Sequence, residues 1–170
     1  MPRKTKLRIW SIFTEADKSM LKTASKPVDL STLASAGMQQ LIDDMIKTMQ
    51  QAEGIGLAAP QIGQPIRLAI VAGEVGDRSE PLVLVNPVVS INDPKQVESE
   101  EGCLSIPGVF GMVPRAGHIT LKAFDRHGQP WSLQAGELLA RVVQHEIDHL
   151  NGLLFLDRLT SYTKGQEKIS

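Results

Sequence analysis

The sequence predicts an α+β fold in which one helix is buried among β-strands. Apolar residues with helical spacing fill two long segments, about residues 29–53 and 135–150, and short β-rich runs lie between them. Strands and helices do not alternate regularly, which disfavours a doubly wound parallel sheet. At 170 residues, 42% of them hydrophobic, the chain can bury one sizeable core, so we expect a single domain over residues 1–170.

The first long helix should follow a capping residue, Asp29 or Ser31, and continue to about Glu53. Gly54 is expected to close it in a left-handed conformation. Its apolar stripe has helical spacing and comprises Leu41, Ile42, Met45, Ile46 and Met49.

Strand signals follow this helix. Residues 66–71 and 82–85 are short β-rich runs, and residues 118–124 alternate apolar with polar side chains. Residues 125–128 have turn chemistry, so residues 131–133 can return as the partner strand.

The second helix should begin near Ala135 and end at Asn151-Gly152. Its apolar surface is too broad for a helix on the protein surface, which predicts burial among the strands. The apolar residues are Leu138, Leu139, Val142, Val143, Ile147 and Leu150.

This helix contains the most informative motif of the chain, His-Glu-Ile-Asp-His at residues 145–149. Side chains four residues apart share one helix face, so His145 and His149 can bind one cation. Glu146 would project beside it, where a carboxylate can handle the protons of a water molecule that the cation activates. The chain has only four histidines, so this arrangement favours a metal site over two ordinary surface histidines.

A catalytic metal usually has three protein ligands and one open position, so a third ligand is needed. The metzincin pattern would place a histidine six residues after His149, but Phe155 stands there. Asp157 and Glu167 remain as possible ligands downstream, the latter in a polar tail.

Upstream, Cys103 is the only cysteine, which precludes an internal disulfide. A lone cysteine is usually a core residue, but the two-histidine site lacks a third ligand, which favours a metal-binding role for the Cys103 thiolate. A thiolate prefers Fe(II), Zn(II), Co(II) or Ni(II) over Mg(II) or Ca(II).

Residues 54–61, Gly-Ile-Gly-Leu-Ala-Ala-Pro-Gln, resemble a dinucleotide fingerprint only in spacing. A helix precedes them where the fingerprint needs a strand, so we reject that interpretation. A glycine turn that brings the backbone close to a ligand remains open, beside a simple helix cap with a packed loop. In the former case the Gln61 amide could donate to a developing oxyanion.

Taken together, GIGLAAPQ (54–61), EGCLS (101–105) and QHEIDHLNG (144–152) resemble, in order and spacing, the three motifs of the peptide deformylase family. The resemblance extends from the first long helix to Asp157. It implies antiparallel β-sheets packed around a central helix that carries the His-Glu-x-x-His motif. It also implies a hydrolase that removes the N-formyl group from the N-terminal methionine of newly made proteins and releases formate.

The resemblance also implies a role for each motif residue. The metal ligands would be Cys103, His145 and His149. Glu146 would be the general acid and base, with Gln61 and the Leu104 backbone N–H as oxyanion donors. The substrate backbone would lie along Ile55 and Gly56. An apolar pocket for methionine would include Leu138 and Val142, although packing alone explains both equally well.

Three residues are expected to support the site. Glu101 and Arg115 are candidates for an ion pair that positions the cysteine loop, the alternative being an exposed surface pair. Gln144 is expected to orient a neighbouring group. Asp148, by contrast, is expected only to serve helix solvation or a local hydrogen bond.

We expect one divalent metal ion as cofactor, with Fe(II) favoured over Zn(II), Ni(II) or Co(II). The expected partners are N-formylmethionyl nascent peptides and the ribosome. A net charge of −1 gives no reason to expect nucleic acid or membrane binding. We expect a cytoplasmic protein, bacterial or phage-encoded. The basic start of the chain gives only a weak organellar targeting signal; its residues are Arg3, Lys4, Lys6 and Arg8. Alternatives are a metallopeptidase with a Cys-His-His site and a non-enzymatic protein with a structural metal.

The sequence departs from the family at two places. Phe110 stands where many bacterial members have a basic residue, which puts a contact with the far end of the substrate in doubt. Many members also continue into a long C-terminal helix, whereas this chain ends at Ser170. That ending suggests a minimal, phage-like or organelle-like variant and puts ribosome docking through such a helix in doubt.

Overall fold

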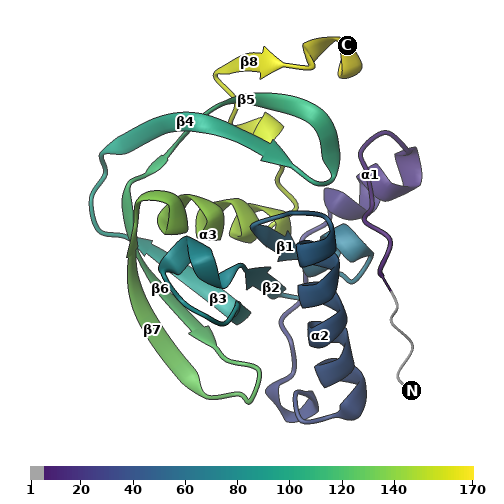
Figure 1. The fold of residues 1–170 in the computed structure, drawn as a ribbon, viewed down its shortest axis with the longest axis vertical. Helices are drawn as coiled ribbons and strands as arrows, with labels where there is room; N and C mark the ends of the chain where they lie inside the picture. The colour runs from purple at the N-terminus through teal and green to yellow at the C-terminus, as the bar shows by residue number, and fades with distance from the viewer. Residues whose placement is uncertain (1–5) are drawn as a thin grey trace.

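The computed structural model describes residues 6–170 (Figure 1). Arg3 and Lys4, two of the four basic residues that give the weak targeting signal, lie outside the described residues. The α-helices are α1 (Glu15–Leu21), α2 (Ala36–Gln51) and α3 (Glu137–Leu150). Short 3-10 helices occupy Leu30–Thr32, Ala59–Ile62, Gly73–Gly76, Phe155–Asp157 and Gln166–Lys168.

The strands form two antiparallel sheets. One has the order β1-β2-β3-β6-β7, and the other has the order β4-β5-β8. Strands of the first sheet are β1 (Gly56–Ala58), β2 (Leu68–Val71), β3 (Leu82–Ile91), β6 (His118–Phe124) and β7 (Pro130–Gly136). Those of the second are β4 (Gln96–Cys103), β5 (Ile106–Ala116) and β8 (Ser161–Lys164).

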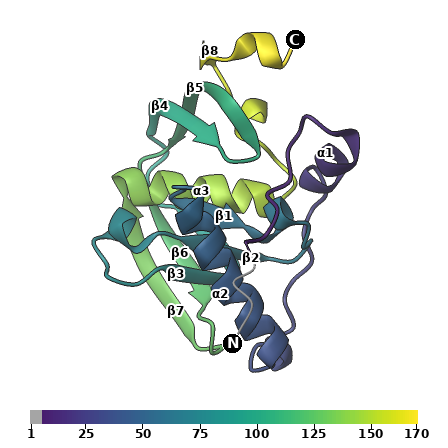
Figure 2. The same ribbon diagram turned by 45° about the vertical axis from the view of Figure 1, so that its right-hand side comes forward.

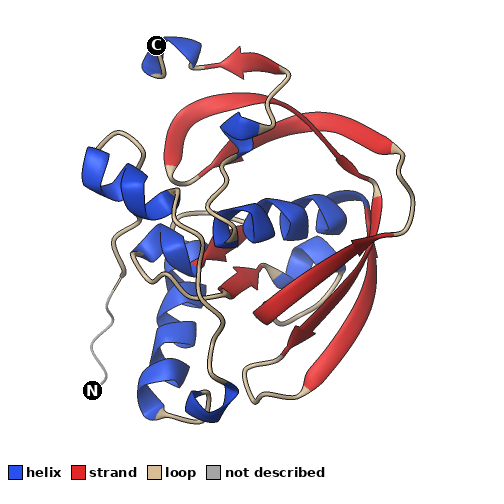
Figure 3. Ribbon diagram, turned by 180° about the vertical axis from the view of Figure 1, so that it is seen from behind, coloured by secondary structure: helices blue, strands red, loops and turns tan. Residues whose placement is uncertain are grey.

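Helix α3 runs between the two sheets, as Figures 1 and 3 show. Ala140, Val143 and Leu150 are fully buried in a core cluster with residues of β2, β3 and β6. On the side of the second sheet, Ile106 and Phe155 belong to another buried cluster. The apolar surface of this helix therefore packs on the first sheet, whereas Arg141 and Asp148 meet the second sheet through ion pairs. The predicted α+β fold with a central helix is confirmed.

Helix α2 lies against β1 and β2 (Figure 2) and buries Ile42, Met45 and Met49 completely. Its predicted ends were wrong. The helix starts after Ser35, whose hydroxyl accepts from the Met38 backbone N–H at 3.3 Å, whereas Asp29 caps only the 3-10 helix at 30–32.

At the other end of α2, Glu53 takes the left-handed conformation expected for Gly54, with φ of 55°. Gly54 has a different physical reason to be glycine. A Cβ there would lie 2.7 Å from Leu104 Cδ1, so a side chain would displace the Leu104 side chain.

Strands β4 and β5 were not predicted from the sequence. Most of β4 is exposed and acidic, and its one large apolar residue, Val97, is 49% exposed. Without a buried apolar face the strand has no period-two signal. Its backbone is nonetheless paired with β5 along its whole length, so tertiary pairing decides its conformation.

The end of α3 is as predicted: Asn151 follows the helix and Gly152 has φ of 74°. A Cβ at this position would lie 2.6 Å from the Lys22 carbonyl oxygen, next to the end of α1. Gly152 therefore permits both the left-handed turn and the close approach of the N-terminal segment. Among residues 6–170, no helix is long and apolar enough to cross a membrane.

Replacing Gly152 should therefore destabilise the fold. We expect Gly152→Ala to lower the free energy of unfolding by about 1–3 kcal/mol, because a positive φ and a backbone contact are both penalised. The matched control is Gly37→Ala in α2, where nothing lies within 4 Å of the new Cβ. Urea unfolding of both variants measures the difference, and equal stabilities would contradict this account.

Candidate metal centre and active site

Three side chains that could hold a metal ion converge at one end of β4 and on one face of α3. Cys103 is the last residue of β4, and His145 and His149 lie one helical turn apart. Cys103 Sγ is 3.3 Å from His149 Nε2, which is 3.2 Å from His145 Nε2, and all three ligand atoms lie within 4.8 Å of one another. Ligands of one tetrahedral cation are about 3.3–3.8 Å apart, so this donor set fits a divalent metal ion.

Glu101 fixes the orientation of His145. Its Oε2 is 2.9 Å from His145 Nδ1, which leaves Nε2 facing the other two donors. Arg115 donates to both carboxylate oxygens at 2.6 and 2.9 Å, and Arg141 donates to Oε1 at 2.8 Å. Burial alone would raise the pKa of Glu101, but the hydrogen bonds and charges of Arg115 and His145 hold it well below its usual range.

The ion pair of Glu101 and Arg115 is not a surface pair, because the two residues are only 7% and 4% exposed. Arg115 also donates to Asp148 at 2.7 Å, and Asp148 accepts two further hydrogen bonds from Arg158. The interpretation of Asp148 as a residue for helix solvation was therefore wrong, since it is 4% exposed and ion-paired. Arg141, which sequence reasoning missed, joins the network through Glu101.

Glu146 lies beside the candidate ligands and is 3% exposed. In the absence of a cation, burial raises the pKa of this carboxyl to about 7, although the charges of His145 and Arg115 lower it. Strand β1 passes directly against it: a Cβ on Gly56 would lie 2.2 Å from Glu146 Oε1. The glycine turn of residues 54–61 therefore brings backbone into the site, as one of the two interpretations of that segment predicted.

Gln61 is held at the same place by hydrogen bonds at both ends of its amide. Its Oε1 accepts from the Ala58 backbone N–H at 2.9 Å. Its Nε2 donates to Ser105 Oγ at 3.1 Å and lies 3.5 Å from Cys103 Sγ. Leu104 follows Cys103 in the turn between β4 and β5. Both residues are thus adjacent to the candidate ligands.

A cavity of about 520 Å³ reaches Cys103 and His145 of this centre and opens to the surface; we call it the groove. His149, which is 1% exposed, does not line it. Two large apolar side chains on it, Ile55 and Leu138, are 44% and 51% exposed, so the groove presents apolar surface to solvent. Most of the predicted site residues line it: Ile55, Gly56, Gln61, Glu101, Cys103, Leu104, Leu138, Val142, His145 and Glu146.

Gln144, expected to orient a neighbouring group, hydrogen-bonds the Ala116 backbone through its Oε1 and Nε2, at 3.2 and 2.8 Å, and so fastens α3 to the end of β5. Phe155 is 1% exposed and stacks on the ring of His145, with centroids 6.3 Å apart. It thus packs against a candidate ligand at the place where the metzincin pattern would put a ligand.

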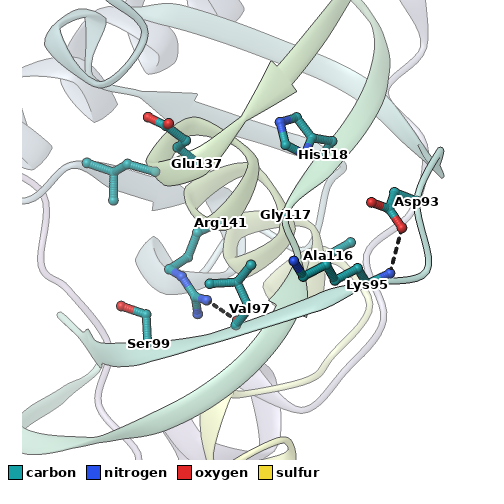
Figure 4. Close-up of a pocket in the computed structure, with 10 residues that line it drawn as sticks. Asp93, Lys95, Val97, Ser99, Ala116, Gly117, His118, Glu137 and Arg141 are labelled. Atoms are coloured by element: carbon teal, nitrogen blue, oxygen red, sulfur yellow. Dashed lines mark hydrogen bonds between the residues drawn. The ribbon is translucent and has the colours of Figure 1, made fainter.

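A second cavity of about 420 Å³ shares Leu138 and Arg141 with the groove. Figure 4 shows Arg141 reaching from α3 to β4, where its Nη2 donates to the Val97 carbonyl at 2.6 Å. Arg141 is therefore part of the partition between the two cavities, and the hydrogen bond to Glu101 connects this partition to the candidate metal centre.

The sequence pattern of the family described as polypeptide deformylase matches residues 10–165. The chain belongs to the polypeptide deformylase family. It is 43% identical over 146 residues to a peptide deformylase of Cellvibrio japonicus, an alignment that covers 86% of this chain and 84% of the relative. The resemblance inferred from the three motifs is confirmed, as is the prediction of a metal-dependent hydrolase.

Solved deformylases have the same fold. A crystal structure of a peptide deformylase from Legionella pneumophila has a TM-score of 0.81 and 44% identity, and the match covers 92% of this chain and 87% of that one. A peptide deformylase from Acinetobacter baumannii, solved with Met-Ala-Ser bound, has a TM-score of 0.82 and 34% identity, covering 92% and 99% of the two chains.

Removing the Glu101 charge should weaken metal binding by this deformylase. We expect Glu101→Gln to lower the affinity for a divalent metal about 10- to 100-fold, because His145 loses the carboxylate that orients it. Competition with a chelator measures the affinity. The control is Asp43→Asn, which removes a surface ion pair with Arg126. Native affinity in Glu101→Gln would contradict the role given to this carboxylate.

A methyl group on residue 56 should displace Glu146. We expect Gly56→Ala to reduce kcat about 100-fold or more while metal content and melting temperature stay near native, because the clash falls on the carboxylate and not on backbone. Gly37→Ala again provides the control. Full activity of Gly56→Ala would mean that the carboxylate does not need its present position.

Proposed function

We propose that this chain removes the N-formyl group from N-formylmethionyl peptides and releases formate. The observation that carries the proposal is the convergence of the Cys103, His145 and His149 donors beside the buried carboxylate of Glu146, at an open apolar groove. Membership of the polypeptide deformylase family supports it. The relative solved with Met-Ala-Ser bound supports a short peptide that begins with methionine as the occupant of such a groove.

Cys103, His145 and His149 would hold one divalent cation. When bound, the cation supplies Lewis acidity, which makes water a stronger nucleophile at neutral pH and polarises the formyl carbonyl. We propose Fe(II) as the native metal, with Zn(II), Ni(II) and Co(II) as alternatives, because one thiolate and two imidazoles suit all four ions.

Glu146 would carry the protons of the reaction. Its carboxylate would take a proton from the attacking water and then give that proton to the amine that leaves the formyl group. Burial keeps the carboxylate away from bulk water, and Gly56 leaves the space that it occupies.

The developing oxyanion would receive hydrogen bonds from the Gln61 amide and the Leu104 backbone N–H. Gln61 is suited to this because the Ala58 backbone holds its Oε1 and so orients its Nε2. Donors fixed in this way stabilise the transition state more than the substrate, and each contributes about 3 kcal/mol.

The remaining groove residues would bind the peptide. The backbone of Ile55 and Gly56 would hold the substrate as an extended strand at the edge of β1, and Leu138 with Val142 would contact the methionine side chain. We further propose nascent chains in the cytoplasm, including chains still on the ribosome, as the physiological substrates. Support comes from the bacterial source of the relatives.

The decisive variant is Glu146→Gln. We expect it to retain the metal, since the three ligands are unchanged, and to lose about 10²- to 10⁴-fold in kcat because the proton carrier is gone. Formate release from formyl-Met-Ala-Ser measures activity, and metal analysis measures retention. Glu74→Gln, a change at an exposed glutamate outside the groove, is the control.

Two outcomes would contradict the proposal. Native turnover by Glu146→Gln would remove the proposed proton carrier. Cleavage of internal peptide bonds, with no preference for formylated termini, would instead favour the metallopeptidase alternative.

A further inference from the structure

The outer edge of the groove is extended by β8. Phe110 of β5 pairs with Gly102 of β4 on one side and with Lys164 of β8 on the other. Paired residues on antiparallel strands present their side chains on the same face of a sheet. Because Phe110 and Gly102 line the groove, Lys164 lies on the groove side of this sheet.

The packing around Phe110 brings positive charge to this edge. The Phe110 ring lies over Gly102, where a Cβ would be 2.5 Å from Cε1. The Lys164 ammonium is 5.8 Å from the centroid of the same ring, a cation–π contact that holds it there. Lys168 reaches Gly108, another groove residue, and its Nζ lies 2.3 Å from the position of a Gly108 Cβ.

Both ammonium groups are available to a ligand. Lys164 and Lys168 are exposed, and neither has a carboxylate within 4.0 Å among residues 6–170. Glu100, which also lines the groove, accepts a hydrogen bond from Thr163 at 2.5 Å and forms no ion pair with Lys164. The two lysines therefore supply free positive charge beside Phe110 and Gly108.

A peptide bound for deformylation would have its formylated end at Glu146, which is 3% exposed, and would extend from there towards the exposed rim of the groove. On the β5 side the groove is lined by Pro107, Gly108 and Phe110, and the two lysines lie against the latter two residues.

We propose that Lys164 and Lys168 select peptides that carry a carboxylate downstream of the formylated residue. The proposal rests on the proposed deformylase function and adds a substrate class to it. The carboxylate can come from an acidic side chain or from the C-terminus of a short peptide. An exposed charge pair is weak and screened by salt, so the preference should be about three- to fivefold at low ionic strength and should fall in high salt.

Four peptides separate the two sources. Formyl-Met-Ala-Glu-amide and formyl-Met-Ala-Gln-amide differ only in a side-chain charge, whereas formyl-Met-Ala-Ser as free acid and as amide differ only in a terminal charge. We expect the charged member of at least one pair to have the higher kcat/KM. The difference should lie in KM, because the contact is remote from the reacting atoms.

The variants test which residues cause the preference. We expect the double variant Lys164→Gln, Lys168→Gln to abolish it and to leave kcat/KM for the Gln amide unchanged, whereas Lys164→Arg should retain it. Lys122→Gln, an exposed lysine on β6, controls for net charge and should also retain it.

Three results would overturn the proposal. The native enzyme could deformylate both members of each pair equally, the double variant could keep the preference, or Lys122→Gln could remove it as well. Each of these leaves the proposed function intact. Formate release from none of the four peptides would overturn the proposed function and this proposal together.

Discussion

The buried carboxylate of Glu101 is the interaction on which the site depends. It comes from β4 and receives hydrogen bonds from Arg115 on β5 and from Arg141 and His145 on α3. Burying charges costs several kcal/mol for each ion unless partners and hydrogen bonds compensate. Each charged residue of this network has its partners only when β4, β5 and α3 are all in place. The network therefore fixes α3 against the second sheet. Cys103, two residues further along β4, is thereby brought to the histidines.

A second constraint comes from the first sheet and acts on Glu146. Strand β1 approaches α3 so closely that residue 56 has no room for a side chain. Gln61, fixed by the Ala58 backbone, lies 3.5 Å from Cys103 Sγ. The two sheets thus contribute different parts of one centre: β4 and β5 orient the candidate ligands, and β1 with the following turn holds the groups that would handle protons and negative charge.

The spacing of residues along the sequence predicted the features that depend on the geometry of a single helix or strand. The spacing of His145 and His149 needs only a helix, and strand β6 shows its alternation at the predicted residues 118–124. The pattern could not reveal the conformation of acidic β4, nor the burial of Arg141 and Asp148. A charged residue on a helix is expected to be exposed. These two are buried because partners 10 to 40 residues away in the sequence neutralise their charges.

The central claim is that Cys103, His145 and His149 bind one divalent cation while Glu146 stays free to move protons. Anomalous diffraction from crystals of the Co(II)-loaded enzyme tests it most directly. The account predicts a single peak in the groove, about 2.0–2.3 Å from Cys103 Sγ and from the Nε2 atoms of the two histidines, with Glu146 outside the coordination sphere. A peak elsewhere, or one coordinated by Glu146 in place of Cys103, would contradict it.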